Sequence, residues 1–515
     1  MCATISRRTF INQGSSRLLA TVMFPYILRI NPGEVLAKPI GEEMNLSDYY
    51  DFFEISQTQI RDIMTEALYR GGDYCDLFFQ YRLTNNIGLE DNAVNRAASD
   101  VDFGVGIRVL KGDQTGYSFT EDISVKAIKL AARSAANIAD LHQTVEPLNL
   151  VFHNHPNYYP IKTPWEGVGI DQKIPYLQKI NERAFELDNR IIKSQLSFAD
   201  ETGYILFANS EGRVIFDYQP MSRIFVSITA EQHGQREQNY YTLSGRHGIE
   251  FFTPENMRRL SEEPVRRTLA LFEAVKPDAG EMEVVLAAGS SGILLHEAIG
   301  HGMEADFNRK NISIYSDKMN KPIAEKFVTI VDDGTNLNVR GSINVDDEGN
   351  DTEKTYLVEN GILRSYLHDR ISANYYRAKT TGNGRRESFR YPPLPRMCNT
   401  YMLPGPHKKD EIIQSIDKGI YAESFTNGQV FIGAGDFTFY VKSGYLIENG
   451  KITRPIKDVN IIGNGPKVLA DVVMVGDDFV MDQGSWVCGK SGQRVPVSLG
   501  LPTVKVAKIT VGGVS

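Results

Sequence analysis

The chain has 515 residues, of which 42% are hydrophobic and 23% charged, and its formal net charge is −8, from 56 basic and 64 acidic residues. This length allows two or more domains with a large apolar core. The acidic balance argues against a protein that binds a nucleic-acid backbone. No apolar run reaches the roughly 18–20 residues that a membrane-spanning helix needs, so we expect no membrane span. The four cysteines are widely scattered, and we expect mostly free thiols.

Residues 1–45 resemble a leader followed by a linker. Two arginines at 7–8 precede an apolar run over 18–28, and VLA at 35–37 offers a cleavage site. This order is similar to a twin-arginine export signal, which carries folded proteins across a bacterial inner membrane. Pro25 and two further arginines in or beside the run are not typical of such a signal. We expect periplasmic export, with a cytoplasmic location as the alternative.

The segment from 46 to 275 contains both helix-like and strand-like sequence patterns. Amphipathic helices are predicted over 55–72, 124–141 and 174–187, where apolar residues recur at helical spacing. Alternating apolar residues around a Lys-Gly-Asp turn predict a β-hairpin over 103–119. Strand-like runs follow at 191–200, 203–210 and 222–230. This order predicts an α+β domain, with an N-terminal α/β arrangement and an antiparallel sheet.

The segment from 276 to 515 is mostly β in pattern. A connecting helix is expected over 261–275 and a strand over 281–288. Asn-Gly lies between strand-like runs at 356–366 and again at 445–455, which is the strongest short signal for a hairpin. We therefore expect a β-rich second domain that holds one apolar helix close to its start.

That apolar helix carries HEAIGH, in which His296 and His301 are five residues apart and Glu297 follows the first histidine. A helix turns about 100° per residue, so two side chains five residues apart point about 140° away from each other and cannot reach one ion. A π-bulge would absorb the extra residue. Alternatively, the helix would unwind at Gly300, where the missing Cβ permits unusual dihedral angles. The sequence does not choose between these two geometries.

The surroundings of the motif favour a metal site. Residues 293–295 and 298–299 are apolar, which indicates a buried helix. A buried, ionised Glu297 is costly unless it is paired or lies near a cation. Zinc takes imidazoles together with a thiolate or carboxylate as ligands. The competing interpretation is that the two histidines and the glutamate are ordinary buried polar residues.

The two histidines leave the ligand set incomplete. Cys488 is a candidate third ligand, because it lies among three glycines that allow a close approach of the backbone. Glu304 and Asp306 compete with it, either as ligands or as hydrogen-bond partners of the imidazole N–H groups. Spacing alone does not rank Cys488 above Glu304, although a thiolate ligand favours zinc over iron or manganese.

Further polar segments are weaker candidates. GNGRRES lacks the Lys-Ser/Thr of a phosphate loop, yet Arg385 and Arg386 could bind a carboxylate or a peptide carbonyl; a solvated loop is the competing interpretation. HNH at 153–155 is expected in a loop. DDEGND at 346–351 is expected in a turn, because it lacks the spacing of a calcium loop.

Taken together, these segments resemble the TldD/PmbA family. HEAIGHGMEADFNR, TGNGRRESFRYPPLPRMCNTYMLPG, IGNGP and VCGKSGQRVPV occur in the order expected of that family. The resemblance covers residues 46–515 and is densest after 285. Members were named modulators of DNA gyrase and are understood as metallopeptidases. The HExxxH motif makes this chain similar to the TldD side, since the partner subunit lacks it.

The resemblance implies a role for each site residue. His296 and His301 match the family's histidine ligands, Cys488 matches its third ligand, and Glu297 matches its catalytic glutamate. It also implies one zinc ion and peptide or unfolded substrates that are reached through an enclosed cavity. A dimer is implied as well, often with a PmbA-type (TldE) partner. Family members are commonly cytoplasmic, so the predicted leader is a departure.

Zinc-dependent peptide hydrolysis is therefore the expected function, with Glu297 as the general acid and base and with Arg385 or Arg386 as a further donor to the oxyanion. The alternative is a non-catalytic subunit of a TldD/PmbA-type complex that the metal only stabilises. Structural zinc sites normally have four protein ligands, so a fourth ligand from Glu304 or Asp306 would favour this alternative. Binding to DNA or gyrase is suggested only by the family's historical name.

Overall fold

The structure is a computed structural model that describes residues 46–140, 145–431 and 433–513. The predicted twin-arginine leader lies outside these residues, as does Cys2. Cys75, Cys398 and Cys488 are free and buried. No helix in the described ranges is long and apolar enough to cross a membrane.

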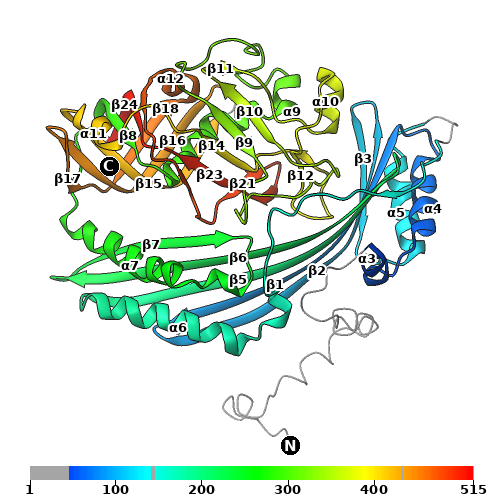
Figure 1. Ribbon diagram of the computed structural model, residues 1–515, viewed down its shortest axis with the longest axis horizontal. Helices are drawn as coiled ribbons and strands as arrows, with labels where there is room; N and C mark the ends of the chain where they lie inside the picture. Colours follow the sequence, from blue (N-terminus) through cyan, green and yellow to red (C-terminus); the bar gives the residue numbers. More distant parts are fainter. Residues whose placement is uncertain (1–45, 141–144, 432, 514–515) are drawn as a thin grey trace, which may run out of the picture.

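A sheet of very long strands forms the N-terminal half of the molecule (Figure 1). Its strands are β1 (Tyr74–Glu90), β2 (Ala93–Lys111), β3 (Gln114–Thr120), β4 (Val151–Phe152), β5 (Ile191–Asn209), β6 (Arg213–Gln232) and β7 (Gln235–Gly245). They are ordered β3-β2-β1-β5-β6-β4, with β7 also paired to β6. All neighbours are antiparallel except β4 and β6. The predicted hairpin around 103–119 is confirmed as β2 and β3.

The runs 191–200 and 203–210 were predicted as two strands, and that prediction is wrong. They form one strand, β5, whose pairing with β6 continues through Thr202 and Gly203 without a shift in register. The Glu-Thr-Gly sequence between the runs is typical of a turn. Ladder hydrogen bonds to strands on both sides keep it extended here.

Helices cover the two ends of this sheet separately. One end packs against α3 (Leu46–Phe52), α4 (Gln57–Leu68) and α5 (Val125–Ala136), and the other against α6 (Ile170–Leu187) and α7 (Pro254–Ala270). The predicted start of α4 is confirmed, because Ser56 and Gln59 form a capping box. The helix predicted at 261–275 begins earlier, at Pro254, since Thr253 caps it and Pro254 fits the first turn.

The C-terminal half contains two larger sheets and two short hairpins. The first sheet is ordered β11 (Ile362–Leu363), β10 (Lys354–Glu359), β9 (Ile330–Asp333), β14 (Asn399–Met402), β23 (Ser498–Leu501), β20 (Val480–Met481). The second is ordered β15 (Lys418–Phe431), β8 (Gly280–Leu286), β24 (Val504–Gly513), β18 (Val459–Asn464), β16 (Asp436–Glu448), β17 (Lys451–Pro455), with β19 (Val472–Val475) beside β24. The short hairpins are β12 (Gly384–Arg385) with β13 (Leu394–Pro395), and β21 (Val487–Lys490) with β22 (Gln493–Pro496).

Short helices connect these strands: α8 (Ile293–Leu295), α9 (Ala305–Arg309), α10 (Arg370–Tyr376), α11 (Lys409–Gln414) and α12 (Gly465–Ala470). Both predicted Asn-Gly hairpins are confirmed. Asn360 and Gly361 have φ of 49° and 77°, and Asn449 and Gly450 have φ of 51° and 72°. Positive φ at both central residues is what the tight type I′ turn requires.

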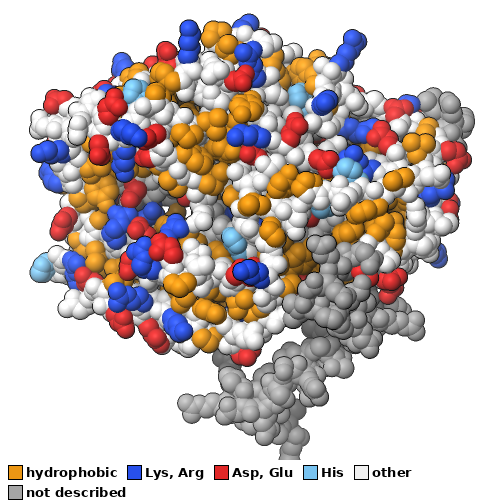
Figure 2. All heavy atoms as spheres, viewed as in Figure 1, with side chains coloured by type: hydrophobic (Ala, Val, Ile, Leu, Met, Phe, Trp, Pro, Cys, Tyr) orange, Lys and Arg blue, Asp and Glu red, His pale blue; other side chains and the backbone are white. Residues whose placement is uncertain are grey.

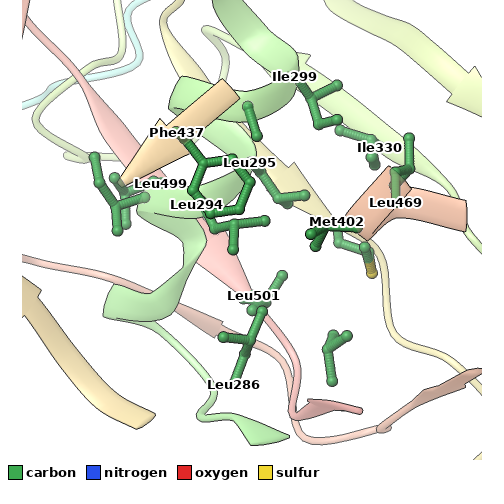
Figure 3. Packing of buried hydrophobic residues seen from close by; sticks show 14 of the residues in the cluster. Leu286, Leu294, Leu295, Ile299, Ile330, Met402, Phe437, Leu469, Leu499 and Leu501 are labelled. Carbon is green, nitrogen blue, oxygen red and sulfur yellow. The ribbon is translucent and has the colours of Figure 1, made fainter. Parts of the chain in front are cut away.

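The apolar helix that carries the HEAIGH motif lies inside the C-terminal core. Leu294, Leu295 and Ile299 are buried among side chains from β8, β14 and β23 (Figure 3). This burial confirms the expected apolar helix close to the start of a β-rich body. The α+β class is confirmed with it, since helices and an antiparallel sheet come first and the β-rich part follows.

A buried ion cluster joins the long sheet to the C-terminal body. Arg108 of β2 lies 2.5 Å from Asp76 of β1 and 2.5 Å from Glu348, and all three side chains are at most 1% exposed. Glu348 belongs to the predicted turn at 346–351, which is confirmed: Asp346 Oδ1 accepts the N–H groups of Glu348 and Asn350. Phe207 of the sheet and Val345 of the body pack in one apolar cluster beside it.

Arg108→Met is expected to lower the free energy of unfolding by about 3–5 kcal/mol, because the carboxylates of Asp76 and Glu348 would stay buried without their nearest cation. The midpoint of thermal unfolding of the full chain measures this effect. Arg258→Met removes a half-exposed arginine of α7 and is the control, with a midpoint close to that of the wild type. Equal midpoints for the two variants would contradict a stabilising role of the cluster.

Candidate metal centre

The extra residue of the HEAIGH motif is absorbed by a π-helical turn. After α8, residues His296–Gly300 are π-helical (η5), and the N–H of His301 donates to the carbonyl of His296, five residues back. A 3₁₀ turn, His301–Met303 (η6), follows. Gly300 keeps helical dihedral angles, with φ −57° and ψ −53°. Of the two geometries left open by the sequence, the π-bulge is therefore the one that forms.

Packing, not backbone freedom, explains why residue 300 is a glycine. A Cβ added to Gly300 would lie 2.0 Å from the sulfur of Met397, a fully buried side chain. A Cβ on Gly302 would lie 2.7 Å from the ring of Tyr315. The two glycines that flank His301 thus let the turn approach its neighbours closely.

Three candidate ligand atoms converge at this turn. The donor atoms of His296, His301 and Cys488 all lie within 4.8 Å of one another. Cys488 Sγ is 3.5 Å from His301 Nε2, and the two imidazole centroids are 5.0 Å apart. The three residues are between 1% and 5% exposed. The fold therefore brings together two segments that are 187 residues apart in the chain.

Cys488 reaches the histidines from the β21–β22 hairpin. Its carbonyl accepts a hydrogen bond from Arg396 Nη2 at 2.6 Å, which anchors the strand from the buried side. The glycines near Cys488 were expected to allow a close approach of the backbone, and at Gly489 and Gly492 no such close approach is found. A Cβ on Gly489 would meet no atom within 4 Å, and Gly492, with φ of 77°, serves the hairpin turn.

Glu304 orients the imidazole of His301. Its Oε2 is 2.9 Å from His301 Nδ1 and 3.1 Å from Lys490 Nζ. Burial alone would raise the pKa of Glu304, but Lys490 and His301 hold it down at about 2. An ionised carboxylate at Nδ1 fixes the proton there and leaves Nε2 facing Cys488.

Asp306 lies farther from the candidate metal ligands than Glu304 does and is linked to them through Lys490 and Glu304. It accepts a hydrogen bond from Lys490 Nζ at 2.7 Å and is not one of the converging donors. Glu304 and Asp306 thus surround Lys490, which also donates to the carbonyl of Pro395. Both carboxylates are placed as supporting groups behind the histidine.

The donor set has the chemistry that zinc requires. Burial would raise the pKa of the Cys488 thiol, but the imidazoles of His296 and His301 lower it well below its usual range. Nδ1 of His296 is buried and has no hydrogen-bond partner among the described residues. Imidazole nitrogen and thiolate sulfur are both ligand types that zinc takes, and three protein ligands are the number found in catalytic zinc sites, so the residues present fit the ion.

Glu297 lies beside this donor set and is more exposed. Its side chain is 22% exposed, and its Oε2 is 4.0 Å from His301 Nε2. It therefore sits on the solvent-accessible side of the three candidate ligands. A carboxylate in this place can exchange a proton with a small molecule bound next to the ligands.

Arg385 and Arg386, the two arginines predicted from the sequence, donate hydrogen bonds to backbone carbonyls and do not face the candidate metal ligands. Arg385 donates to the carbonyls of Met397 and Pro496 at 2.5 and 2.8 Å. Arg386 donates to the carbonyl of Asp347 at 2.7 Å and lies over the ring of Phe78. The guanidinium of Arg385 supports the strand next to β21, and that of Arg386 supports the sheet–body contact.

Lys490 and Arg396 contact the candidate site residues and were not predicted from the sequence. Lys490 follows Cys488 by two residues in a strand, which places both side chains on the same face. That spacing was a usable signal. Arg396 carries no comparable signal, because its contact with Cys488 depends entirely on the fold.

Comparisons with known proteins cover nearly the whole described chain. Models of the PmbA/TldA metallopeptidases match it in order: domain 1 over residues 75–139, the central domain over 163–272 and the C-terminal domain over 279–513.

Full-length relatives are similar as well. A "metalloprotease TldD homolog" from Haemophilus influenzae is 39% identical over 461 residues, which are 88% of this chain and 95% of that protein. A "zinc metalloprotease TldD homolog" from Saccharolobus solfataricus is 30% identical over 450 residues, or 86% and 97% of the two chains. The crystal structure of TldE from Thermococcus kodakarensis has a TM-score of 0.69 at 18% identity and covers 89% of this chain and 99% of its own. This last likeness shows the fold alone.

Gly300→Ala is expected to weaken zinc binding about tenfold, because relieving the clash with Met397 costs about 1–3 kcal/mol and displaces the π-helical turn. Competition with a chromogenic zinc chelator measures the affinity. Gly489→Ala adds the same methyl group beside Cys488 in open space and should bind zinc as the wild type does. Unchanged affinity in Gly300→Ala would contradict the role given to this close contact.

Glu304→Gln is expected to reduce zinc affinity by about 10–100-fold, because His301 loses the charged partner that orients its ring. The same chelator competition measures the change. Asp306→Asn touches Lys490 but no ligand, and a much smaller loss is expected there. Equal losses in the two variants would mean that the charge on Lys490 matters and the contact with His301 does not.

Proposed function

The chain belongs to the PmbA/TldD metallopeptidase family, and we propose that it is a zinc-dependent metallopeptidase that hydrolyses peptides or unfolded polypeptide segments. The observation that carries the proposal is the convergence of His296, His301 and Cys488 within 4.8 Å, with the carboxylate of Glu297 at their exposed side. The relatives named as metalloproteases support the same reaction class.

His296, His301 and Cys488 would hold the ion. A zinc ion bound by three protein ligands would supply Lewis-acid polarisation of a peptide carbonyl and activation of water. The chain itself prepares these ligands. The lowered pKa of Cys488 keeps its sulfur available as a thiolate, and Glu304 holds the proton of His301 at Nδ1, away from the other donors.

Glu297 is the proposed catalytic base. Its carboxylate would accept a proton from the attacking water and deliver it to the leaving amine, so that one group serves as base and then as acid. Its partial exposure lets it meet a substrate, while its distance of 4.0 Å from His301 Nε2 keeps it outside the ligand set. Arg385 and Arg386, engaged with backbone carbonyls, have no assigned step.

The competing function, a subunit that the metal only stabilises, needs a closed site. Structural zinc sites normally have four protein ligands. Glu304, the nearest further carboxylate, contacts Nδ1 of His301 and not the face on which Nε2 and Cys488 meet. Asp306 contacts Lys490. A site with three converging donors and an accessible carboxylate beside them favours the enzyme.

Glu297→Gln is expected to abolish peptide cleavage while one zinc ion per chain remains bound, because the amide keeps the shape of the site but cannot accept the proton. Cleavage of casein or of a quenched fluorescent peptide measures activity, and elemental analysis measures zinc. The chain is assayed alone and with a PmbA/TldE-type partner, and a chelator should stop the wild type. Glu353→Gln, on an exposed residue, is the control. Full activity in Glu297→Gln would refute the assigned role.

A further inference from the structure

A cavity of about 440 Å³ lies between the long sheet and the C-terminal body. β6 contributes Arg223, α7 contributes Arg267, β16 contributes Lys442, and the loop before β21 contributes Trp486. Figure 2 shows a hollow between the C-terminal body and the region of α7, with Lys and Arg side chains gathered at its edge and Asp and Glu among them.

One wall of this cavity and a candidate metal ligand belong to the same short segment. Trp486 lines the cavity, and Cys488 lies two residues farther along the same segment. Two residues of fully extended chain span at most about 7 Å. A peptide that extends a few residues beyond the metal centre would therefore come within reach of this cavity.

The lining carries more positive than negative charge. Lys442 and Arg223 form no ion pair with any carboxylate of the described chain, and Arg267 has Glu263 at 3.7 Å. Asp482 is the acidic lining residue, and it accepts hydrogen bonds from Trp486 Nε1 and from a backbone N–H. Burial raises the pKa of Asp482, which weakens it as a counter-charge.

A buried arginine stands behind the same wall. Arg340 is 7% exposed, and its Nε donates to the carbonyl of Trp486 at 3.0 Å. It has no ion pair within the described part of the chain. Burial and the nearby charge of Arg223 lower the pKa of Arg340 to about 10. Buried cations without a counter-ion are costly, so an anion placed between these groups would stabilise them.

From this arrangement we infer that the cavity binds a carboxylate of the substrate, so that the peptidase prefers peptides that present a carboxylate at this position. The carboxylate is either the free C-terminus or the side chain of an Asp or Glu near the scissile bond. Guanidinium groups bind carboxylates through paired, charge-assisted hydrogen bonds. The inference rests on the proposed function, because it names the substrate feature that is held next to the same site.

Binding to the full-length, zinc-loaded Glu297→Gln variant tests this directly and does not depend on turnover. Peptides of one sequence are compared as free acid and C-terminal amide, and with Glu or Gln at an internal position, by isothermal titration calorimetry. The acidic member of one pair should bind about tenfold more tightly, and the pair that shows the difference identifies the source of the carboxylate. Equal affinity within both pairs would overturn the inference.

A charge change on the cavity wall locates the effect. In the Glu297→Gln variant, the second substitution Arg223→Gln should remove most of the preference for the acidic peptide. Arg223→Glu should reverse that preference in favour of the neutral peptide. Arg223 is exposed on β6, so neither change disturbs the core. Arg258→Gln, on the exposed face of α7, should leave the preference intact. A preference that persists in Arg223→Glu would place the carboxylate elsewhere and refute the site.

The two proposals fail in different ways. If the variant prefers acidic peptides but the wild type, with zinc and with its partner, cleaves none of them, the peptidase function is wrong and the carboxylate site stands. If the wild type cleaves neutral and acidic peptides with equal kcat/KM and binds them equally, the peptidase function stands and the carboxylate site is wrong.

Discussion

Two histidines five residues apart must face one point, and the structure of the metal centre depends on this constraint. A regular α-helix would separate their rings by about 140°. The π-helical turn His296–Gly300 removes that separation, and it forms inside a core where every neighbour is already packed. The close contact of Gly300 with Met397 shows how little space the turn has. The geometry of the donors is therefore set by packing around the turn and not by the motif alone.

The same core must also hold charge. Glu304 and Lys490 are both buried and lie 3.1 Å apart; Arg396 is a second cation near the carboxylate, and Asp306 is a second anion beside the ammonium. Such a network costs desolvation that only good mutual geometry offsets. The network lies behind His301, where Glu304 holds this candidate ligand in one tautomer and one orientation. The buried charges thus affect the site in two ways: they fix the orientation of the His301 ring, and they set the electrostatic potential around it.

Local signals accounted for much of the fold, because their causes lie within a few residues of the chain. The capping box at Ser56 and the Asn-Gly hairpins are of this kind. The break predicted near 201–203 failed because pairing with both neighbouring strands overrides a local turn preference. At the site, the histidines and glutamate were visible on one helix. Cys488 needed the family resemblance, and Arg396 needed the fold, since no sequence pattern brings segments so far apart together.

The long strands determine how the molecule deforms. β1 and β5 each cross both apolar clusters of the N-terminal half: Leu77 and Leu206 belong to one cluster, and Leu89 and Leu196 to the other. Opening either cluster would break ladders that continue into its neighbour, so the two respond as one cooperative unit. The face that β6 presents to the cavity is consequently stiff. The loop at 482–486 shares this stiffness, because Gly484 and Ser485 are hydrogen-bonded to Ser244 and Thr242 of β7, the strand beside β6.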